Sequence, residues 1–209
     1  FGFIYAPLVI TGLHHMTNAI DLQLIADYHG TMLWPMIALS NIAQGSAVLG
    51  MIYLQRKNAA AQEVNVPACV SCYLGVTEPA IFGVNLKYYF PFLCGMTGSA
   101  CAAVLCVSMG TTANAIGVGG LPGILSIQPT FMLSFAMSAA VAIAVPFILT
   151  VIVGMKRGVG AVPAVDAAAT EAEQAAEMMS PDVVPESERE MTAFLDGQVI
   201  PLSEVGDGV

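Results

Sequence analysis

The chain has 209 residues, of which 56% are hydrophobic and only 10% are charged, and its mean hydropathy is +0.75. Soluble domains carry about 25% charged residues, so this composition excludes an ordinary soluble domain and indicates a membrane protein. The net charge of −9 gives no reason to expect a nucleic-acid partner, because nucleic-acid binding needs a basic surface.

The acidic charge is confined to the last part of the chain. Residues 1–158 hold four acids and five bases, whereas residues 159–209 hold eleven acids and one base, Arg189. Two regions of different physical character therefore share one chain, an apolar region followed by an acidic one.

Three apolar segments are long enough to cross a bilayer as helices, which takes about 20 residues each. They run from about Met32 to Leu54, from about Tyr88 to Met109 and from about Phe131 to Met155. The remaining bases all flank these segments: Arg56, Lys57, Lys87, Lys156 and Arg157. The positive-inside rule assigns these flanks, and with them the C-terminal tail, to the cytoplasm.

This assignment predicts a re-entrant hairpin between the first two spans. If both flanks are cytoplasmic, the intervening chain must leave and return on one side, and its apolar part, residues 67–86, is too short to cross twice. It contains residues expected to interrupt regular helix: Pro67, Gly75, Pro79 and Gly83. Irregular backbone persists in a membrane only where it lines protein or a water-filled cavity. We place Glu78 at the tip of this hairpin.

A second irregular segment, residues 113–129, lies toward the outer face by the same reasoning. Its glycines allow tight turns and close backbone approach. It is either an ordinary outer loop or a second, partly buried hairpin, and the sequence leaves both open.

After Gly158 the chain becomes rich in Ala, Glu and Pro, which predicts a flexible acidic linker over residues 159–192. An alternating segment with an Asp196-Gly197 turn then predicts the first strand of a β domain. The chain starts without Met and stops inside this segment. We therefore expect both ends to be cuts in a longer protein.

Two features could carry chemistry. The first is Glu78, because a carboxylate in a membrane segment is costly and indicates function by default; a structural capping or salt-bridge role is the alternative. The second is the pair His14 and His15, followed by Thr17 and Asn18. Adjacent residues do not share a helix face, so we expect one histidine to face a ligand and the other to be structural. Such groups in an apolar cavity suit a polyol such as a sugar.

The five cysteines lie in apolar sequence, and two of them, Cys69 and Cys72, form a C-x-x-C pair. Without a second pair or clustered histidines, the interpretation as a zinc site is weak. We interpret the cysteines as small buried residues between helices, and expect no metal and no cofactor.

Two segments resemble a known family. Gly12–His15 reads GLHH and Gly75–Gly83 reads GVTEPAIFG. They look like signature segments of the C domain, the permease, of enzyme II in the glucose superfamily of the phosphoenolpyruvate-dependent phosphotransferase system. Residues 1–158 resemble the C-terminal half of that domain, and most closely its trehalose-specific branch. Independently, GQVIPLSEV at residues 197–205 resembles the opening strand of the glucose-type A domain, a soluble phosphocarrier, whose truncated beginning we place at residues 193–209.

The resemblance implies an all-α membrane fold, with three spanning helices and the re-entrant hairpin, in a bacterial inner (plasma) membrane. The implied activity is group translocation. A disaccharide, trehalose, is bound outside and phosphorylated at its 6-hydroxyl as it is released inside. The phosphate comes from a phosphocysteine on a B domain, which the A domain and the phosphocarrier protein of the system recharge. Relatives also suggest a homodimer in membrane lipid.

The resemblance also assigns roles at the site. Glu78 and one of His14 and His15 would hydrogen-bond the sugar hydroxyls, with Thr77 and Asn18 alongside, and either group could act as the catalytic base. Two alternatives stay open. One is a sucrose-type permease of the same system, and the other is a non-phosphorylating secondary transporter, which also binds substrate on broken helices.

Overall fold

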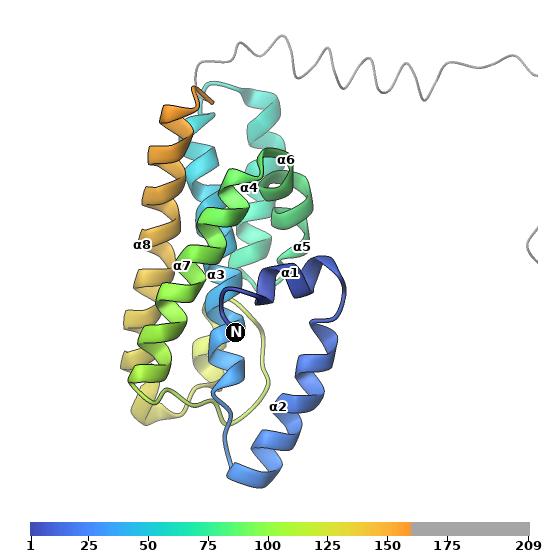
Figure 1. Ribbon diagram of the computed structural model, residues 1–209, viewed down its shortest axis with the longest axis vertical. Helices are drawn as coiled ribbons and strands as arrows, with labels where there is room; N and C mark the ends of the chain where they lie inside the picture. The colour runs from blue at the N-terminus through green and yellow to red at the C-terminus, as the bar shows by residue number, and fades with distance from the viewer. Residues whose placement is uncertain (160–209) are drawn as a thin grey trace, which may run out of the picture. The chain divides into compact units, whose positions relative to one another are not determined.

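The computed structural model of the protein describes residues 1–159, and the predictions for residues 160–209 lie outside this part. The described part is built from helices (Figure 1). In chain order they are α1 (Tyr5–Ile10), α2 (His15–Tyr28), α3 (Leu33–Leu54), α4 (Ala59–Tyr73), α5 (Glu78–Ala80), the π-helix η1 (Ile81–Asn85), α6 (Leu86–Tyr88), α7 (Phe90–Ser108), the 3₁₀ helices η2 (Leu121–Ser126) and η3 (Pro129–Phe131), and α8 (Met132–Lys156).

Helices α3, α7 and α8 are long and apolar enough to cross a membrane. They confirm the three predicted spans, with helix ends within two residues of the expected ones. The most apolar of them, α8, is the least buried, and the least apolar, α3, is the most buried. The reason is position: α3 packs against α4, α7 and α8 at once. Its side chains therefore meet protein, whereas much of α8 faces outward.

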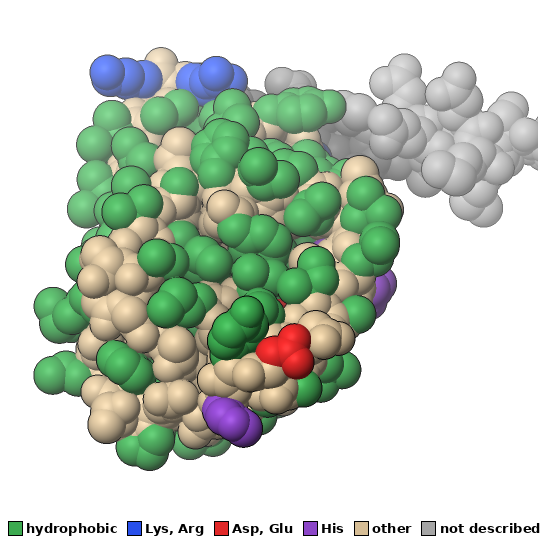
Figure 2. Space-filling view, turned by 60° about the horizontal axis from the view of Figure 1, so that its bottom comes forward, with side chains coloured by type: hydrophobic (Ala, Val, Ile, Leu, Met, Phe, Trp, Pro, Cys, Tyr) green, Lys and Arg blue, Asp and Glu red, His purple; other side chains and the backbone are tan. Residues whose placement is uncertain are grey.

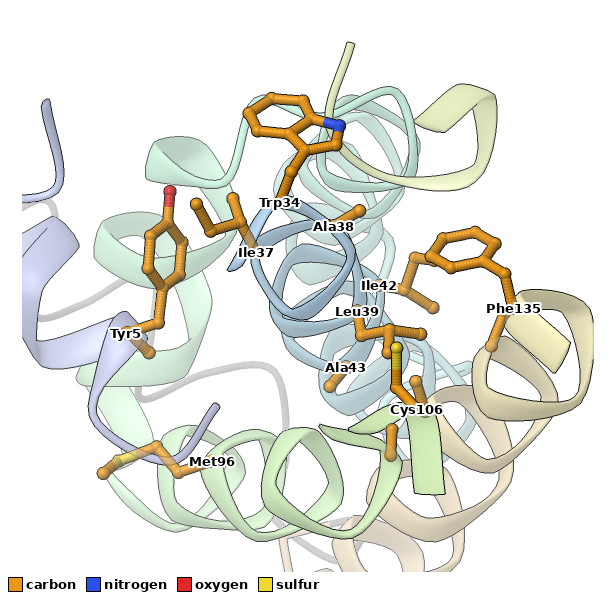
Figure 3. Close-up of a cluster of buried hydrophobic side chains, with 14 of the residues drawn as sticks. Tyr5, Trp34, Ile37, Ala38, Leu39, Ile42, Ala43, Met96, Cys106 and Phe135 are labelled. Atoms are coloured by element: carbon orange, nitrogen blue, oxygen red, sulfur yellow. The ribbon is translucent and has the colours of Figure 1, made fainter. Parts of the chain in front are cut away.

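The three spans pack closely because glycines face bulky neighbours. A Cβ at Gly98 of α7 would overlap the ring of Pro146 in α8, and one at Gly50 of α3 would overlap the side chain of Thr150. Around them, buried apolar side chains of α3, including Leu39 and Ile42, form the main core (Figure 3). Close backbone approach through small residues is the usual way in which spanning helices associate.

Helices α4, α5, η1 and α6 form a hairpin beside α3. Helix α4 starts at Asn58, whose side chain accepts a hydrogen bond from the backbone N–H of Ala61 at 3.2 Å. Contrary to expectation, Pro67 does not interrupt it, since α4 continues to Tyr73. Pro67 is exposed, so its ring lies outside the packed interface with α3. The insertion of this hairpin in a membrane stays a prediction.

The segment between α7 and α8 folds back into the bundle. Ala113 and Ile127 are buried and form a β-bridge with each other. Further along, the backbone of Gly119 lies so close to Gly75, in the turn of the hairpin, that a Cβ at Gly75 would overlap it. Of the two alternatives for residues 113–129, a partly buried segment fits the structure better than an ordinary loop.

The C-terminal ends of α3 and α8 and the junction of α6 with α7 all lie at one end of the bundle (Figure 1). Lys and Arg side chains gather there, whereas the face turned forward in Figure 2 shows hydrophobic side chains mixed with uncharged surface and few charged groups. Contacts between the helix ends agree with this arrangement. Arg157, after α8, lies 5.5 Å from the ring centre of Phe90 at the start of α7, and Gly154 of α8 adjoins Leu54 at the end of α3. The bases that were predicted to share one side of the membrane therefore share one end of the bundle.

Four of the five cysteines are buried, as expected, and Cys101 is exposed. Both members of the C-x-x-C pair face α3. The Cys69 thiol donates to the carbonyl of Gly45 at 3.4 Å, and the Cys72 thiol donates to the carbonyl of Asn41 at 3.1 Å. These contacts join α4 to α3.

Candidate functional site

The turn between α4 and α5 fixes the position of Glu78. Gly75 has φ +107°, a conformation that glycine adopts without the strain other residues incur. The Asn41 side chain, from the middle of α3, donates a hydrogen bond to the Gly75 carbonyl at 3.2 Å, and Gly119 packs against both Gly75 and this side chain. Glu78 then begins α5. The backbone that carries this acid is thus held from two other segments of the chain.

The structure brings His14 and Glu78 together. His14 is the residue before α2, and its Nε2 atom lies 3.9 Å from Oε1 of Glu78. This distance allows electrostatic attraction when the imidazole is protonated but is too long for a hydrogen bond. Glu78 is about half exposed, whereas His14 is mostly buried. The His14 Nδ1 atom is buried without a partner among the described residues, so the Nε2 edge is the one that faces the acid.

The two histidines differ in their surroundings although their rings are in contact. The rings of His14 and His15 lie against each other, with centroids 4.0 Å apart and planes inclined by 37°. His14 precedes α2 and lies near Glu78, whereas only His15 belongs to the helix; that one of the two faces a ligand stays a prediction. His15 is exposed, and its ring limits how far the His14 ring can turn. His14 therefore lies next to Glu78, and His15 lies next to His14.

The other two candidates are placed differently. Thr77 precedes α5 and is buried, and its carbonyl accepts the backbone N–H of Ile81 at 2.9 Å. Asn18 lies on α2 and is exposed. The structure therefore groups His14, His15 and Glu78, whereas Thr77 is buried and Asn18 is exposed on α2.

Tyr5 belongs beside this group although sequence reasoning did not select it. Its ring packs edge-on against His14, with centroids 6.3 Å apart, and its hydroxyl points away from Met96 in Figure 3. Burial, with smaller effects from the charges of Glu78 and Asp21, raises the pKa of Tyr5 to about 12. The hydroxyl therefore stays protonated and can donate a hydrogen bond. A lone tyrosine in an apolar segment gives no signal by which this could be predicted.

Asp21 is a second missed residue. It is fully buried in α2, and its Oδ1 accepts a hydrogen bond from the Thr31 hydroxyl at 2.6 Å. Burial raises the pKa of the Asp21 carboxyl, against the lowering effect of hydrogen bonds from Thr31 and from the backbone of Trp34. The Thr31 hydroxyl also accepts the backbone N–H of Leu33 at 3.0 Å. Asp21 thus ties α2 to the start of α3.

A hairpin with a polar turn, set among spanning helices, is typical of membrane transporters, which bind polar solutes at such breaks. The fold and the site therefore define the class of the protein as a multi-pass helical membrane protein with a transporter-like polar turn.

The comparisons with known proteins narrow this class to a family. The family model described as "Phosphotransferase system, EIIC" matches residues 1–99. The chain is 61% identical over 150 residues to the PTS system trehalose-specific EIIBC component of Escherichia coli (strain K12). The aligned region covers 72% of this chain and 32% of that protein. Residues 1–99, which the family model matches, belong to the EIIC family of the phosphotransferase system.

Two further relatives agree. The PTS system trehalose-specific EIIBC component of Bacillus subtilis (strain 168) is 49% identical over 148 residues, which is 70% of this chain and 31% of that protein. The PTS system sucrose-specific EIIBC component of Pasteurella multocida (strain Pm70) is 42% identical over 159 residues, which is 75% of this chain and 33% of that protein. The chain therefore spans about a third of the length of the curated relatives it matches. No solved structure matches it.

Proposed function

We propose that this chain is the sugar-binding part of a phosphotransferase-system transporter that takes up trehalose as trehalose 6-phosphate. The observation that carries the proposal is the pairing of His14 with Glu78, because these residues come from two segments distant in sequence. Trehalose is favoured over sucrose because the trehalose-specific relatives are 61% and 49% identical and the sucrose-specific relative 42%.

In this proposal Glu78 and His14 hydrogen-bond the sugar hydroxyls, and one of them acts as a catalytic base. The oxygen of the 6-hydroxyl attacks the phosphorus of a phosphocysteine on the B domain, the P–S bond breaks, and the thiolate leaves. The hydroxyl proton passes to the Glu78 carboxylate or to His14. General-base catalysis of this kind contributes about 10²–10⁴-fold. His15 restricts the His14 ring, and Thr77 and Asn18 supply further hydrogen bonds.

The same proposal sets the orientation in the membrane and the partners. The basic end of the bundle faces the cytoplasm of a bacterial inner membrane, as the positive-inside rule requires, and the C-terminal tail follows it there. Phosphate reaches the B domain from the phosphocarrier protein through the A domain. The transporter works as a homodimer in the lipid bilayer.

The proposal is tested with membranes that carry the whole protein. Phosphoenolpyruvate-dependent phosphorylation should be measured with trehalose and with sucrose in parallel. Trehalose should be phosphorylated with the higher kcat/KM. Faster phosphorylation of sucrose would favour the sucrose-type alternative, for which the 42% identical relative is the support. Sugar uptake without phosphorylation would indicate a secondary transporter and contradict the proposal.

A further inference from the structure

A second site candidate lies far from Glu78, at the basic end of the bundle. A surface pocket of about 260 Å³ opens between the last turn of α3 and the last turn of α8. Its lining is Tyr53, Leu54, Arg56, Lys57 and Met155. The pocket thus combines two positive charges with an apolar wall, a combination that neither a purely polar nor a purely apolar ligand matches.

Four of the bases at this end have no acidic partner within the described part of the chain. No carboxylate of residues 1–159 lies within 4.0 Å of Arg56, Lys57, Lys156 or Arg157. The Arg56 guanidinium lies 5.6 Å from the ring centre of Tyr53, which is half exposed. The arginine is therefore held over an aromatic ring at the mouth of the pocket, and its N–H groups remain available to an anion.

An apolar stripe on α8 leads into the same pocket. Ile148, Ile152 and Met155 are all exposed, and their spacing places them on one face of the helix. Met155 also lines the pocket. On the α3 side, the Tyr53 ring packs against Phe147 with centroids 6.3 Å apart. A ligand with a charged head and a long apolar tail could therefore contact the bases and the stripe at once.

We propose that this pocket binds the headgroup of an anionic phospholipid, with the phosphate between Arg56 and Lys57 and an acyl chain along the α8 stripe. Basic pockets between helix ends at a membrane surface are a known mode of binding acidic lipid headgroups. Arginine binds phosphate oxygens through two parallel N–H donors, and the neighbouring lysine adds a point charge. The proposal does not depend on the sugar that the protein carries.

The test uses the full chain in lipid nanodiscs of pure phosphatidylcholine and of an equimolar mixture with phosphatidylglycerol. Phosphatidylglycerol should raise the Tm of the wild type by about 2–4 °C, because a ligand that binds only the folded state stabilises it. The double variant Arg56→Gln/Lys57→Gln should lose at least half of this rise. The matched control is Lys156→Gln/Arg157→Gln, which removes the same charge from the same end and should keep the rise.

A second variant separates the pocket from the charge. Met155→Trp keeps every base and partly fills the pocket, and since Met155 is exposed the fold should tolerate it; this variant should also lose the rise. Equal losses in the two double variants would overturn the proposal in favour of general charge attraction. An equal rise with soluble glycerol phosphate would exclude a lipid site. A rise that appears only after residues 160–209 are removed would mean that the chain's own acidic segment occupies the pocket.

Discussion

Helices α7 and α8 on one side, and the hairpin of α4 to α6 on the other, both pack against α3, but different forces hold them. The α7 and α8 contacts depend mainly on glycines and apolar side chains, with one hydrogen bond from the Gln44 side chain to the Phe92 carbonyl of α7 at 3.4 Å. The hairpin is also tied by polar side chains: Asn85 donates to the Gln44 side-chain oxygen at 2.7 Å, and Ser46 is hydrogen-bonded to the Tyr73 hydroxyl at 2.9 Å. Helix α3 thus packs against the other spans through apolar contacts and against the hairpin through hydrogen bonds as well. We call the hydrogen-bonding side chains on the α3 side of the hairpin, Asn41, Gln44, Ser46 and Gln55, the polar clamp.

The polar contacts extend along the whole hairpin. Gln55, at the end of α3, donates to the Tyr88 hydroxyl at 2.7 Å and accepts from the Asn65 side chain at 3.0 Å. Asn41 holds the turn at the other end. Hydrogen bonds are directional, so these contacts fix the register of the hairpin more narrowly than apolar packing would. We infer that the spans form the scaffold and that the polar clamp sets the position of Glu78.

The largest effect is expected from disrupting the apolar packing between the spanning helices. Gly98→Leu should destabilise the bundle by about 3 kcal/mol, the upper end of typical overpacking costs, because a side chain there meets the rigid ring of Pro146. Thermal unfolding in detergent measures the loss. Gly83→Leu is the control, since Gly83 is exposed with only Val64 near its Cβ position. Equal losses would show that the Gly98 contact is not specific.

Breaking the polar clamp should have a smaller and more local effect. Asn85→Leu leaves the Gln44 amide buried without this partner, which typically costs about 1–3 kcal/mol. Hydrogen exchange should increase in the hairpin, residues 59–88, more than in α8. The double variant Gln44→Leu/Asn85→Leu should recover part of the loss because both polar groups are gone. If exchange rises equally in both regions, the clamp is not a separate unit.

At the site, Glu78→Gln should leave the Tm unchanged while phosphorylation of trehalose falls at least about tenfold, which is equivalent to about 1.4 kcal/mol. The amide keeps the size of the side chain but cannot act as a base. Glu63→Gln provides the control, since it is an exposed acid on α4 and should retain full activity. Wild-type activity in Glu78→Gln would remove this residue from the site.

The smallest effect is expected from the second histidine. His14→Gln should reduce phosphorylation about as strongly as Glu78→Gln, because His14 faces that acid at 3.9 Å. His15→Gln should reduce it by less than about threefold, or less than about 0.7 kcal/mol, since its ring only supports the first. Parallel assays on the two variants measure the ratio. A greater loss in His15→Gln would reverse the assignment.

The spans could be predicted from the sequence because their signal is local. Each is an apolar segment of bilayer length with bases beside it, and both features are visible without any partner. The hairpin around Glu78 could be placed only in outline, and Pro67 was misjudged. Proline usually breaks a helix, but α4 continues through Pro67, which lies on an exposed side of it.

The polar clamp and the site residues Tyr5 and Asp21 could not be predicted from the sequence, for a different reason. Gln44 and Asn85 are far apart in sequence, and each alone is one amide in an apolar segment. Tyr5 and Asp21 likewise acquire meaning only when α1 and α2 fold beside the turn. His14 and Glu78 could be selected because a histidine pair and an acid within an apolar segment are unusual in themselves.

The inverse relation between hydropathy and burial among the three spans has a consequence for how the chain enters its membrane. Segments are inserted in the order of synthesis, so α3 reaches the bilayer before the hairpin that pairs its Asn41, Gln44 and Gln55. Unpaired amides make a helix a poor candidate for stable insertion on its own. The strongly apolar α8 has no such handicap. Helix α3 therefore gains the partners of its amides only after the hairpin, including Asn85, has been made.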